Sequence, residues 1–186
     1  MDVTDVTKFA TVYPVLSAKE IVQSPQYQEI MVKLRGCISV SNEEYKEYYL
    51  PLFYNFAEFV QNFSGVHNSN PGGIINFGFL RALESMPYAF EHKYFDENLR
   101  YAILCLALLG EVGQVFSGRR IVICNQDGDY IEEWDPFHDH LYAKNRYYRL
   151  IEISDLPQSH AKVLNPHFAV RIIPQSGWDR LMANPS

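Results

Sequence analysis

A long stretch of apolar periodicity at residues 42–63 constrains the fold of this chain more than any other feature of its sequence. Large apolar and aromatic side chains recur there every three or four residues: Tyr45, Tyr48, Tyr49, Leu52, Phe53, Phe56, Phe59 and Val60. Because this spacing puts them on one face of an α-helix, we predict a core helix. Ser41 followed by Glu44 matches a capping box at its start, and Pro51 predicts a kink near its middle.

Other segments show the same spacing between helix start and stop residues. Ser17 with Glu20 is a second capping-box pattern, and Asp96 can cap a strongly apolar helix. Pro87 should help to end the helix that precedes it. We expect helices from Ser17 to Gly36 with an interruption at Ser24–Pro25, then at residues 72–86, 97–113, 136–145 and 158–172, and a last helical turn at 176–182.

One region departs from the helical pattern. Residues 120–124 and 129–133 are typical of strands, and they flank Asn125-Gln-Asp-Gly128, whose Asp-Gly pair favours a tight turn. We therefore predict one small β-hairpin, followed by the short helix at 136–145 and an irregular segment at 147–153. The expected fold class is mainly α with one small β-hairpin insertion.

Length and composition favour a single domain. With 186 residues, of which 47% are hydrophobic and 15% aromatic, the chain can bury one sizeable core. We place that domain at residues 15–186, after an N-terminal extension at residues 1–14. The three cysteines, Cys37, Cys105 and Cys124, are odd in number and far apart, which indicates a reducing compartment and no disulfide framework.

Charge and hydropathy limit the classes of partner. A net charge of -6 and a pI near 5.5 make nucleic acid an unlikely partner, since such affinity comes largely from neutralising phosphates. The most compact basic cluster, Arg119-Arg120 with Lys144, Arg146 and Arg149, is expected to be an ordinary solvated face. The longest apolar run, Tyr101–Leu109, is about half the length a bilayer requires, and residues 1–15 do not resemble a secretory signal. We expect no membrane span and a cytoplasmic location.

Two segments resemble a known family. Residues 67–79 read His-Asn-Ser-Asn-Pro-Gly-Gly-Ile-Ile-Asn-Phe-Gly-Phe, and residues 108–114 read Leu-Leu-Gly-Glu-Val-Gly-Gln. In this order they resemble the relaxase domain of MobH-type conjugation proteins, the TraI-like family, where the second segment carries the His-Asp pair of an HD-type metal hydrolase. Val15–Glu20, Trp134–Pro136 and Ile173–Leu181 are similar to further family segments. The resemblance implies an HD-like helical bundle.

The departures from this pattern concern the metal ligands. The resemblance places Phe77 and Gly110 at ligand histidines, Glu111 at the aspartate and Gln114 at the lysine that follows it, and reduces a histidine pair to His67-Asn68. Such a site needs about three or four protein ligands to hold a divalent cation. We therefore expect no metal, no cofactor and no catalytic residue. We also expect Phe77 and Gly110 to be adjacent buried positions that fill the former pocket.

Other residue combinations offer weaker alternatives. His138-Asp139-His140, with His160 and His167, is the densest group of potential metal ligands, but residues two apart on a helix point away from each other. Cys105 lies in the most apolar helix and is expected to be a buried structural thiol. The paired tyrosines, among them Tyr147-Tyr148, are interpreted as core and interface residues rather than as platforms for bases.

These observations lead to one leading functional hypothesis and two alternatives. The leading hypothesis is a pseudoenzyme: a relaxase-like scaffold or adaptor that binds protein partners in a type IV conjugation or secretion system, such as a Dot/Icm-type coupling complex. The first alternative is a metal-dependent DNA-nicking or phosphohydrolase enzyme whose site has moved to His67, Glu111 and His138 or His140. The second is a DNA-binding accessory protein that retains the relaxase surface without its chemistry.

Overall fold

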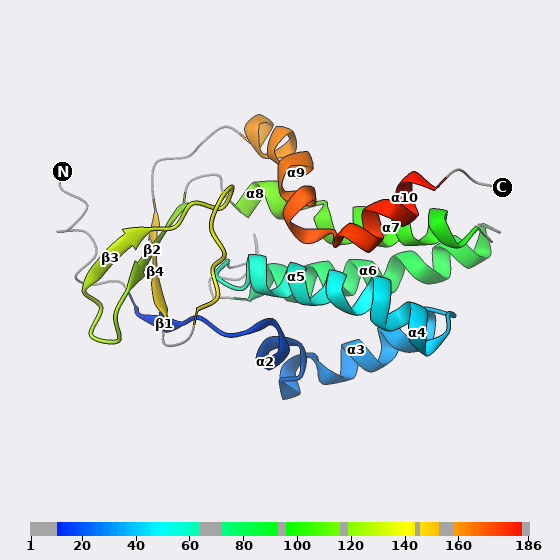
Figure 1. Ribbon diagram of the computed structural model, residues 1–186, viewed down its shortest axis with the longest axis horizontal. Helices are drawn as coiled ribbons and strands as arrows, with labels where there is room; N and C mark the ends of the chain where they lie inside the picture. Colours follow the sequence, from blue (N-terminus) through cyan, green and yellow to red (C-terminus); the bar gives the residue numbers. More distant parts are fainter. Residues whose placement is uncertain are drawn as a thin grey trace.

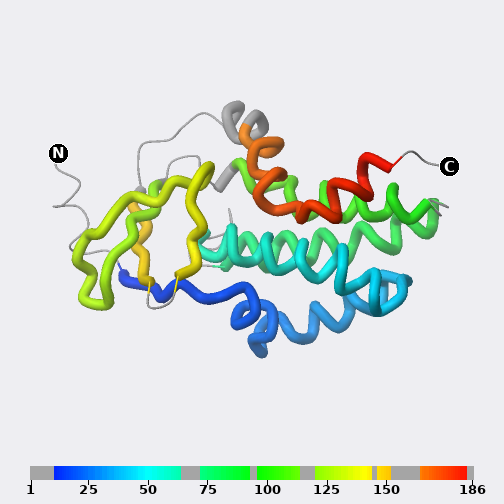
Figure 2. The backbone as a smooth tube through the Cα atoms, viewed as in Figure 1, coloured from blue at the N-terminus to red at the C-terminus, as the bar shows by residue number. Residues whose placement is uncertain are grey.

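The chain folds into a mostly helical structure with a four-stranded antiparallel sheet at one end (Figure 1). The computed structural model describes residues 11–63, 72–92, 96–115, 119–143, 146–152 and 158–183. Figures 1 and 2 show α5 and α6 running through the middle, with α2 and α3 on one side and α9 and α10 on the other. The predicted mainly helical character is confirmed. None of the described helices combines the length and the apolar character needed to cross a membrane.

The first helices begin at the residues that the sequence indicates. In α2 (Ala18–Val22), the Ser17 side chain accepts from the Glu20 backbone N–H, and the Glu20 side chain accepts from the backbone of Ser17. These hydrogen bonds satisfy free amides of the first turn. After the Ser24–Pro25 interruption, α3 (Pro25–Cys37) starts with its proline in the first turn, where a missing N–H costs nothing, and buries Tyr27, Met31 and Leu34.

The predicted core helix is continuous but contains a π-helical turn. The Ser41–Glu44 capping box opens α4 (Asn42–Glu44), which leads into the π-helical segment η2 (Tyr45–Tyr49) and then α5 (Leu50–Val60). The irregularity that Pro51 predicted therefore lies in the turn that precedes it. Such a turn accommodates a proline because the carbonyl groups there bond one residue further along the chain.

Two boundaries expected around α6 and α7 are wrong. α6 (Gly73–Glu91) does not end before Pro87 but continues through it. Burial of Met86 and Ala89 holds this last turn, since tertiary packing outweighs the loss of one backbone hydrogen bond. The helix expected at 97–113 is divided into α7 (Glu97–Leu109), capped by Asp96 as predicted, and α8 (Val112–Val115). Gly110 and Glu111 lie in the turn between them.

The sheet is larger than the single hairpin expected. The hairpin exists as β2 (Arg119–Cys124) and β3 (Tyr130–Glu133), and Gly128 in its turn has a positive φ of 89°. β4 (Tyr147–Glu152), expected to be irregular, pairs with β2 along its whole length, and β1 (Tyr13–Pro14) pairs with β4. The sheet order is β1-β4-β2-β3. It thus includes two residues that were expected to belong to the N-terminal extension.

The remaining segments return to the helical layer. The helix expected at residues 136–145 is wrong: a turn occupies 136–138, where Asp135 accepts from the Phe137 amide, and the chain is non-helical through 143. Residues 144 and 145 lie outside the described residues. α9 (Gln158–Ile172) has the predicted bounds, and α10 (Gln175–Met182) extends the expected last turn.

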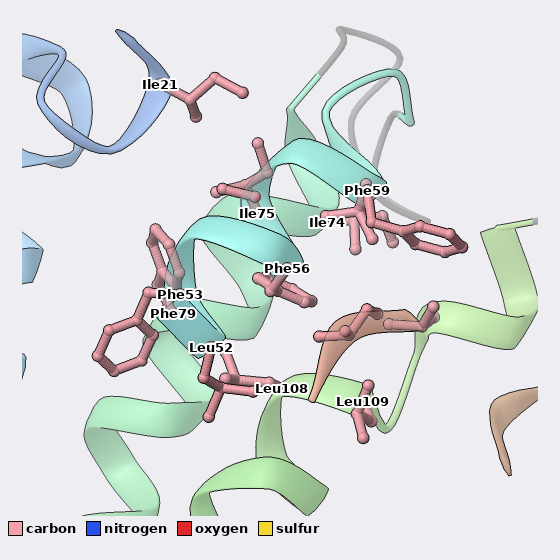
Figure 3. Close-up of a cluster of buried hydrophobic side chains, with 14 of the residues drawn as sticks. Ile21, Leu52, Phe53, Phe56, Phe59, Ile74, Ile75, Phe79, Leu108 and Leu109 are labelled. Carbon is pink, nitrogen blue, oxygen red and sulfur yellow. The ribbon is translucent and has the colours of Figure 1, made fainter. Parts of the chain in front are cut away.

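The core lies where α5, α6 and α7 meet (Figure 3). Phe53, Phe56 and Phe79 are fully buried, and Phe79 contacts both of the other rings at centroid distances of 5.8 Å. Each buried ring of this kind stabilises the fold by about 1.5–3 kcal/mol. The aromatic side chains that recur in residues 42–63 therefore pack α5 against α6.

Candidate functional site

The first half of α6 and the turn between α7 and α8 meet at a guanidinium group. Arg81 lies one turn after Phe77 on α6, and its Cζ is 5.3 Å from the Phe77 ring centroid. Its Nη1 donates to Glu111 Oε1 at 3.2 Å. Phe77, Arg81 and Glu111 thus form a cation–π contact joined to an ion pair that links α6 to the turn after α7. We call this group, together with Gly110, the Arg81 cluster.

Gly110 leaves space for the guanidinium of the Arg81 cluster. A Cβ atom at Gly110 would lie 3.4 Å from Arg81 Nη1, so a larger side chain there would compete with the guanidinium for space. Asn165 of α9 holds the turn from the other side: its Nδ2 donates to the Gly110 carbonyl at 3.2 Å, and its Oδ1 accepts from the Gly113 amide at 2.5 Å. The backbone around Glu111 is therefore fixed by three helices.

The structure brings together three of the six positions that the resemblance singled out. Phe77, Gly110 and Glu111 all adjoin Arg81. Gln114 falls in α8, while His67 and Asn68 lie outside the described residues. The sequence interpretation missed Arg81 and Asn165. Arg81 could have been found from its spacing of four residues from Phe77, whereas no local pattern marks Asn165.

The expectation that Phe77 and Gly110 fill a buried pocket is wrong. Phe77 is 39% exposed, and Gly110 is also exposed. The reason is the orientation of α6, whose buried face is formed by Gly78, Phe79 and Ala82, so that Phe77 is left on the outer side. A cation from the protein itself, and not a plug of apolar side chains, occupies the space between these positions.

The electrostatics of the Arg81 cluster oppose binding of a second cation. The Arg81 guanidinium already neutralises Glu111, and a divalent ion beside it would experience like-charge repulsion. Phe77 and Gly110 offer no ligand atoms in their side chains. The cluster can therefore crosslink helices and present a mixed aromatic and charged surface, but its described side chains do not fit a metal.

The histidine-rich segment after β3 forms a different site. His138 Nδ1 is 2.7 Å from Asp135 Oδ2, and His138 is largely exposed. His140 lines a pocket of about 100 Å³ with Glu58 of α5 and Arg171 of α9. Burial raises the pKa of Glu58 above its ordinary value of 4.5. Arg171 donates to the backbone carbonyls of His138 and Asp139.

Of the residues named for the relocated site of the enzyme alternative, His67 lies outside the described residues, and the other three have separate partners. Glu111 is paired with Arg81, His138 contacts Asp135, and His140 faces a pocket whose lining does not include Glu111. In the part of the chain that the structure describes, no three histidine, cysteine or acidic residues gather in a way that could hold a metal.

The basic cluster is only in part the solvated face that we expected. Arg120 is paired with Glu133 at 3.4 Å, and Arg146 is paired with Glu132. Arg149 is buried, and its guanidinium packs against Gly128, where a Cβ atom would collide with it. Much of the positive charge on this sheet is thus neutralised or covered.

The predicted structural role of Cys105 agrees with its surroundings. Its thiol is buried in α7 beside Tyr101, and burial raises its pKa to about 12. A thiol with such a pKa stays protonated at neutral pH and is a poor nucleophile.

No known protein-family model matches this chain, and no curated protein matches it. The geometry of the Arg81 cluster and of the surrounding helices therefore carries the functional argument.

Proposed function

We propose that this chain is a non-catalytic, HD-like domain of the relaxase type that acts as a scaffold or adaptor for protein partners. Its setting would be a type IV conjugation or secretion system, for example a Dot/Icm-type coupling complex in the cytoplasm. The observation that carries the proposal is the Arg81 cluster, in which a guanidinium and an engaged carboxylate occupy the neighbourhood of the expected ligand positions.

The chemistry of this cluster supports a loss of hydrolysis. An HD-type hydrolase uses a metal to generate hydroxide and to stabilise a phosphoryl centre. Here the positive charge belongs to Arg81, which cannot activate a water molecule as a metal ion does. Arg81 also forms an ion pair with Glu111, the one carboxylate at the position of the His-Asp signature. A protein of this kind would keep the helical frame of the family while its helix faces became available for binding.

The enzymatic test uses the purified chain. Divalent metal content is measured by elemental analysis, and phosphodiesterase activity is measured with added Mg²⁺, Mn²⁺ or Zn²⁺. We expect neither a stoichiometric metal nor turnover above the buffer. A stoichiometric metal together with turnover that is lost on His67→Ala would overturn the proposal.

A restoration experiment tests the role assigned to Arg81. The variant Phe77→His/Gly110→His/Glu111→Asp reintroduces the ligand types of the family, and a second variant adds Arg81→Ala. We expect metal binding by calorimetry only in the variant without Arg81, because its guanidinium lies against both position 77 and position 110. Equal metal affinity in the two variants would contradict the role of Arg81 as the resident cation.

A further inference from the structure

The outer face of α7 is apolar where a surface helix is expected to be polar. From Ala102 to Leu109 every side chain is apolar, while only one side of the helix, with Tyr101, Leu104 and Leu108, faces the core. The opposite side exposes Leu99 and Leu106, with exposed fractions of 43% and 72%. A helix that is apolar all round is normally covered on all sides. The uncovered side of α7 therefore indicates a surface that binds a partner.

α6 extends this surface. It packs along α7 and exposes Phe77, Leu80 and Tyr88 at helical spacing, with exposed fractions between 39% and 54%. The Arg81–Glu111 ion pair bridges the two helices at one end of the seam and is itself partly exposed. We call the combined area the α6–α7 face; its apolar members are Phe77, Leu80, Tyr88, Leu99, Ile103 and Leu106.

The charges on the α6–α7 face are unbalanced toward the acidic side. Glu84 and Glu91 are exposed on α6 and form no ion pair among the described residues. The arginines of the two helices are already engaged, Arg81 with Glu111 and Arg100 with Glu97. A partner that covers the apolar side chains must therefore bring positive charge to the rim.

We infer that the α6–α7 face binds an amphipathic helix of another protein, with an apolar stripe bordered by lysine and arginine. The binding mode is a helix laid along a helical pair, with side chains spaced at i, i+3, i+4 and i+7 as anchors. α7 runs from Glu97 to Leu109, a length of about 20 Å, so a partner helix of about 14 residues spans it. A second copy of this chain fits less well, because pairing would bring Glu84 and Glu91 close to acidic groups of the same kind. This inference rests on the proposed function, of which it specifies the partner.

The test is a titration of the full chain with a synthetic helix of about 14 residues, carrying leucines on one face and lysines and arginines beside them. Two control peptides have the same composition in scrambled order, or glutamate in place of the basic residues. Binding is followed by fluorescence anisotropy. We expect binding of the amphipathic basic peptide only. Equal binding of the scrambled peptide would overturn the inference, because it would reduce the interaction to net charge.

Variants locate the binding. Leu106→Glu should weaken binding of the basic peptide by at least about tenfold, since it removes a central anchor. Glu84→Lys/Glu91→Lys should weaken it as well. The matched control is Val32→Glu on α3, because Val32 is 69% exposed, as Leu106 is 72%, but lies on another helix. Unchanged affinity in Leu106→Glu, or an equal loss in Val32→Glu, would overturn the inference.

The outcomes separate this inference from the proposed function. Light scattering of the chain gives its oligomeric state; a dimer that Leu106→Glu dissociates would assign the α6–α7 face to a second copy and overturn the inference. Equal binding of the scrambled peptide and a dimer that Leu106→Glu dissociates would each overturn the inference, but neither result contradicts the adaptor proposal. Metal-dependent turnover would overturn the adaptor proposal, whatever the peptide result.

Discussion

Gly78 lies where α6 crosses the ring of Phe56, and this close approach sets the distance between α5 and α6. A Cβ atom at Gly78 would collide with the end of the Phe56 ring, which is fully buried. Gly36 of α3, by contrast, has open space around it. Packing therefore requires a glycine at position 78, whereas the glycine at position 36 only lowers the stability of its helix.

Substitutions at these glycines should change stability in opposite directions. Gly78→Ala should lower the free energy of unfolding by about 1–3 kcal/mol, since the core must shift to admit a methyl group. Gly36→Ala should raise it by up to about 1 kcal/mol, because alanine favours the helix. Urea unfolding followed by circular dichroism measures both. A Gly78→Ala protein as stable as the parent would contradict the contact with Phe56.

Glu58 makes stability depend on pH. Because burial raises its pKa above 4.5, the folded state keeps a proton that the unfolded state has released. Glu58 therefore does not lower the free energy of unfolding below about pH 4.5, where it is protonated in both states. As the pH rises through the pKa of the folded state, its ionisation destabilises the fold. The backbone hydrogen bond from Ala18, and to a smaller extent the nearby His140, lower the pKa of Glu58 and thus oppose this effect.

Glu58→Gln should accordingly raise the melting temperature relative to the parent protein at pH 7, and the difference should disappear at pH 4. Differential scanning fluorimetry across this range measures it. The exposed Glu84→Gln serves as the control and should show no such change with pH. A difference between the Glu58→Gln variant and its parent that is independent of pH would exclude ionisation of Glu58 as its cause.

Among the elements, α10 packs on the bundle through Trp178 and Leu181, and Arg180 adds a polar attachment. The Arg180 side chain is 8% exposed, donates to Glu97 at 2.9 Å and has Glu44 at 3.8 Å. Its Cζ lies 4.7 Å from the ring centroid of Tyr48 and 5.9 Å from those of Tyr49 and Tyr101. The periodicity assigned Tyr48 and Tyr49 of η2 to the core. Their rings also make cation–π contacts with Arg180.

Arg180→Met should release this attachment while it keeps most of the side-chain volume. We expect a loss of about 1–3 kcal/mol in the free energy of unfolding, because the cation–π contacts and both ion pairs disappear. The loss is limited because water can still solvate the carboxylates of Glu44 and Glu97. The control is Lys33→Met, which breaks an exposed pair with Glu29 and should leave the free energy of unfolding nearly unchanged, because solvent screens such a pair. Chemical denaturation of both variants gives the comparison; equal losses would exclude a special role for Arg180.

For the molecule as a whole, acidic residues outnumber basic ones. The chain carries a net charge of -6, and Arg120 and Arg146 of the sheet region are paired with glutamates. A phosphate backbone would have to displace these pairs. This distribution supports a protein partner over a nucleic acid.

A labelled single-stranded oligonucleotide should therefore show no binding that depends on salt. We expect a flat mobility-shift titration at low and moderate ionic strength. Binding that weakens steeply with salt, and that is lost on Arg120→Ala, would support the DNA-binding alternative instead.

Elements whose causes are local could be predicted from the amino-acid sequence. The capping boxes at Ser17 and Ser41 and the cap at Asp96 were predicted, because backbone amides and side chains within one turn satisfy each other. The bounds of α9 were predicted as well. The hairpin turn was predicted because its Asp-Gly pair suits the positive φ found at Gly128. Side-chain spacing likewise identified the buried face of α5.

Features that depend on residues far apart in the chain could not be predicted, because they arise from packing between elements. β4 becomes a strand because β2 lies beside it, and α6 passes Pro87 because Met86 and Ala89 are buried. The Arg81–Glu111 pair joins residues from two parts of the bundle, and Asn165 reaches the same turn from a third. Periodicity reports which face of an element is apolar, but not which element covers it. For the same reason, it could not show that Phe77 lies outside the core.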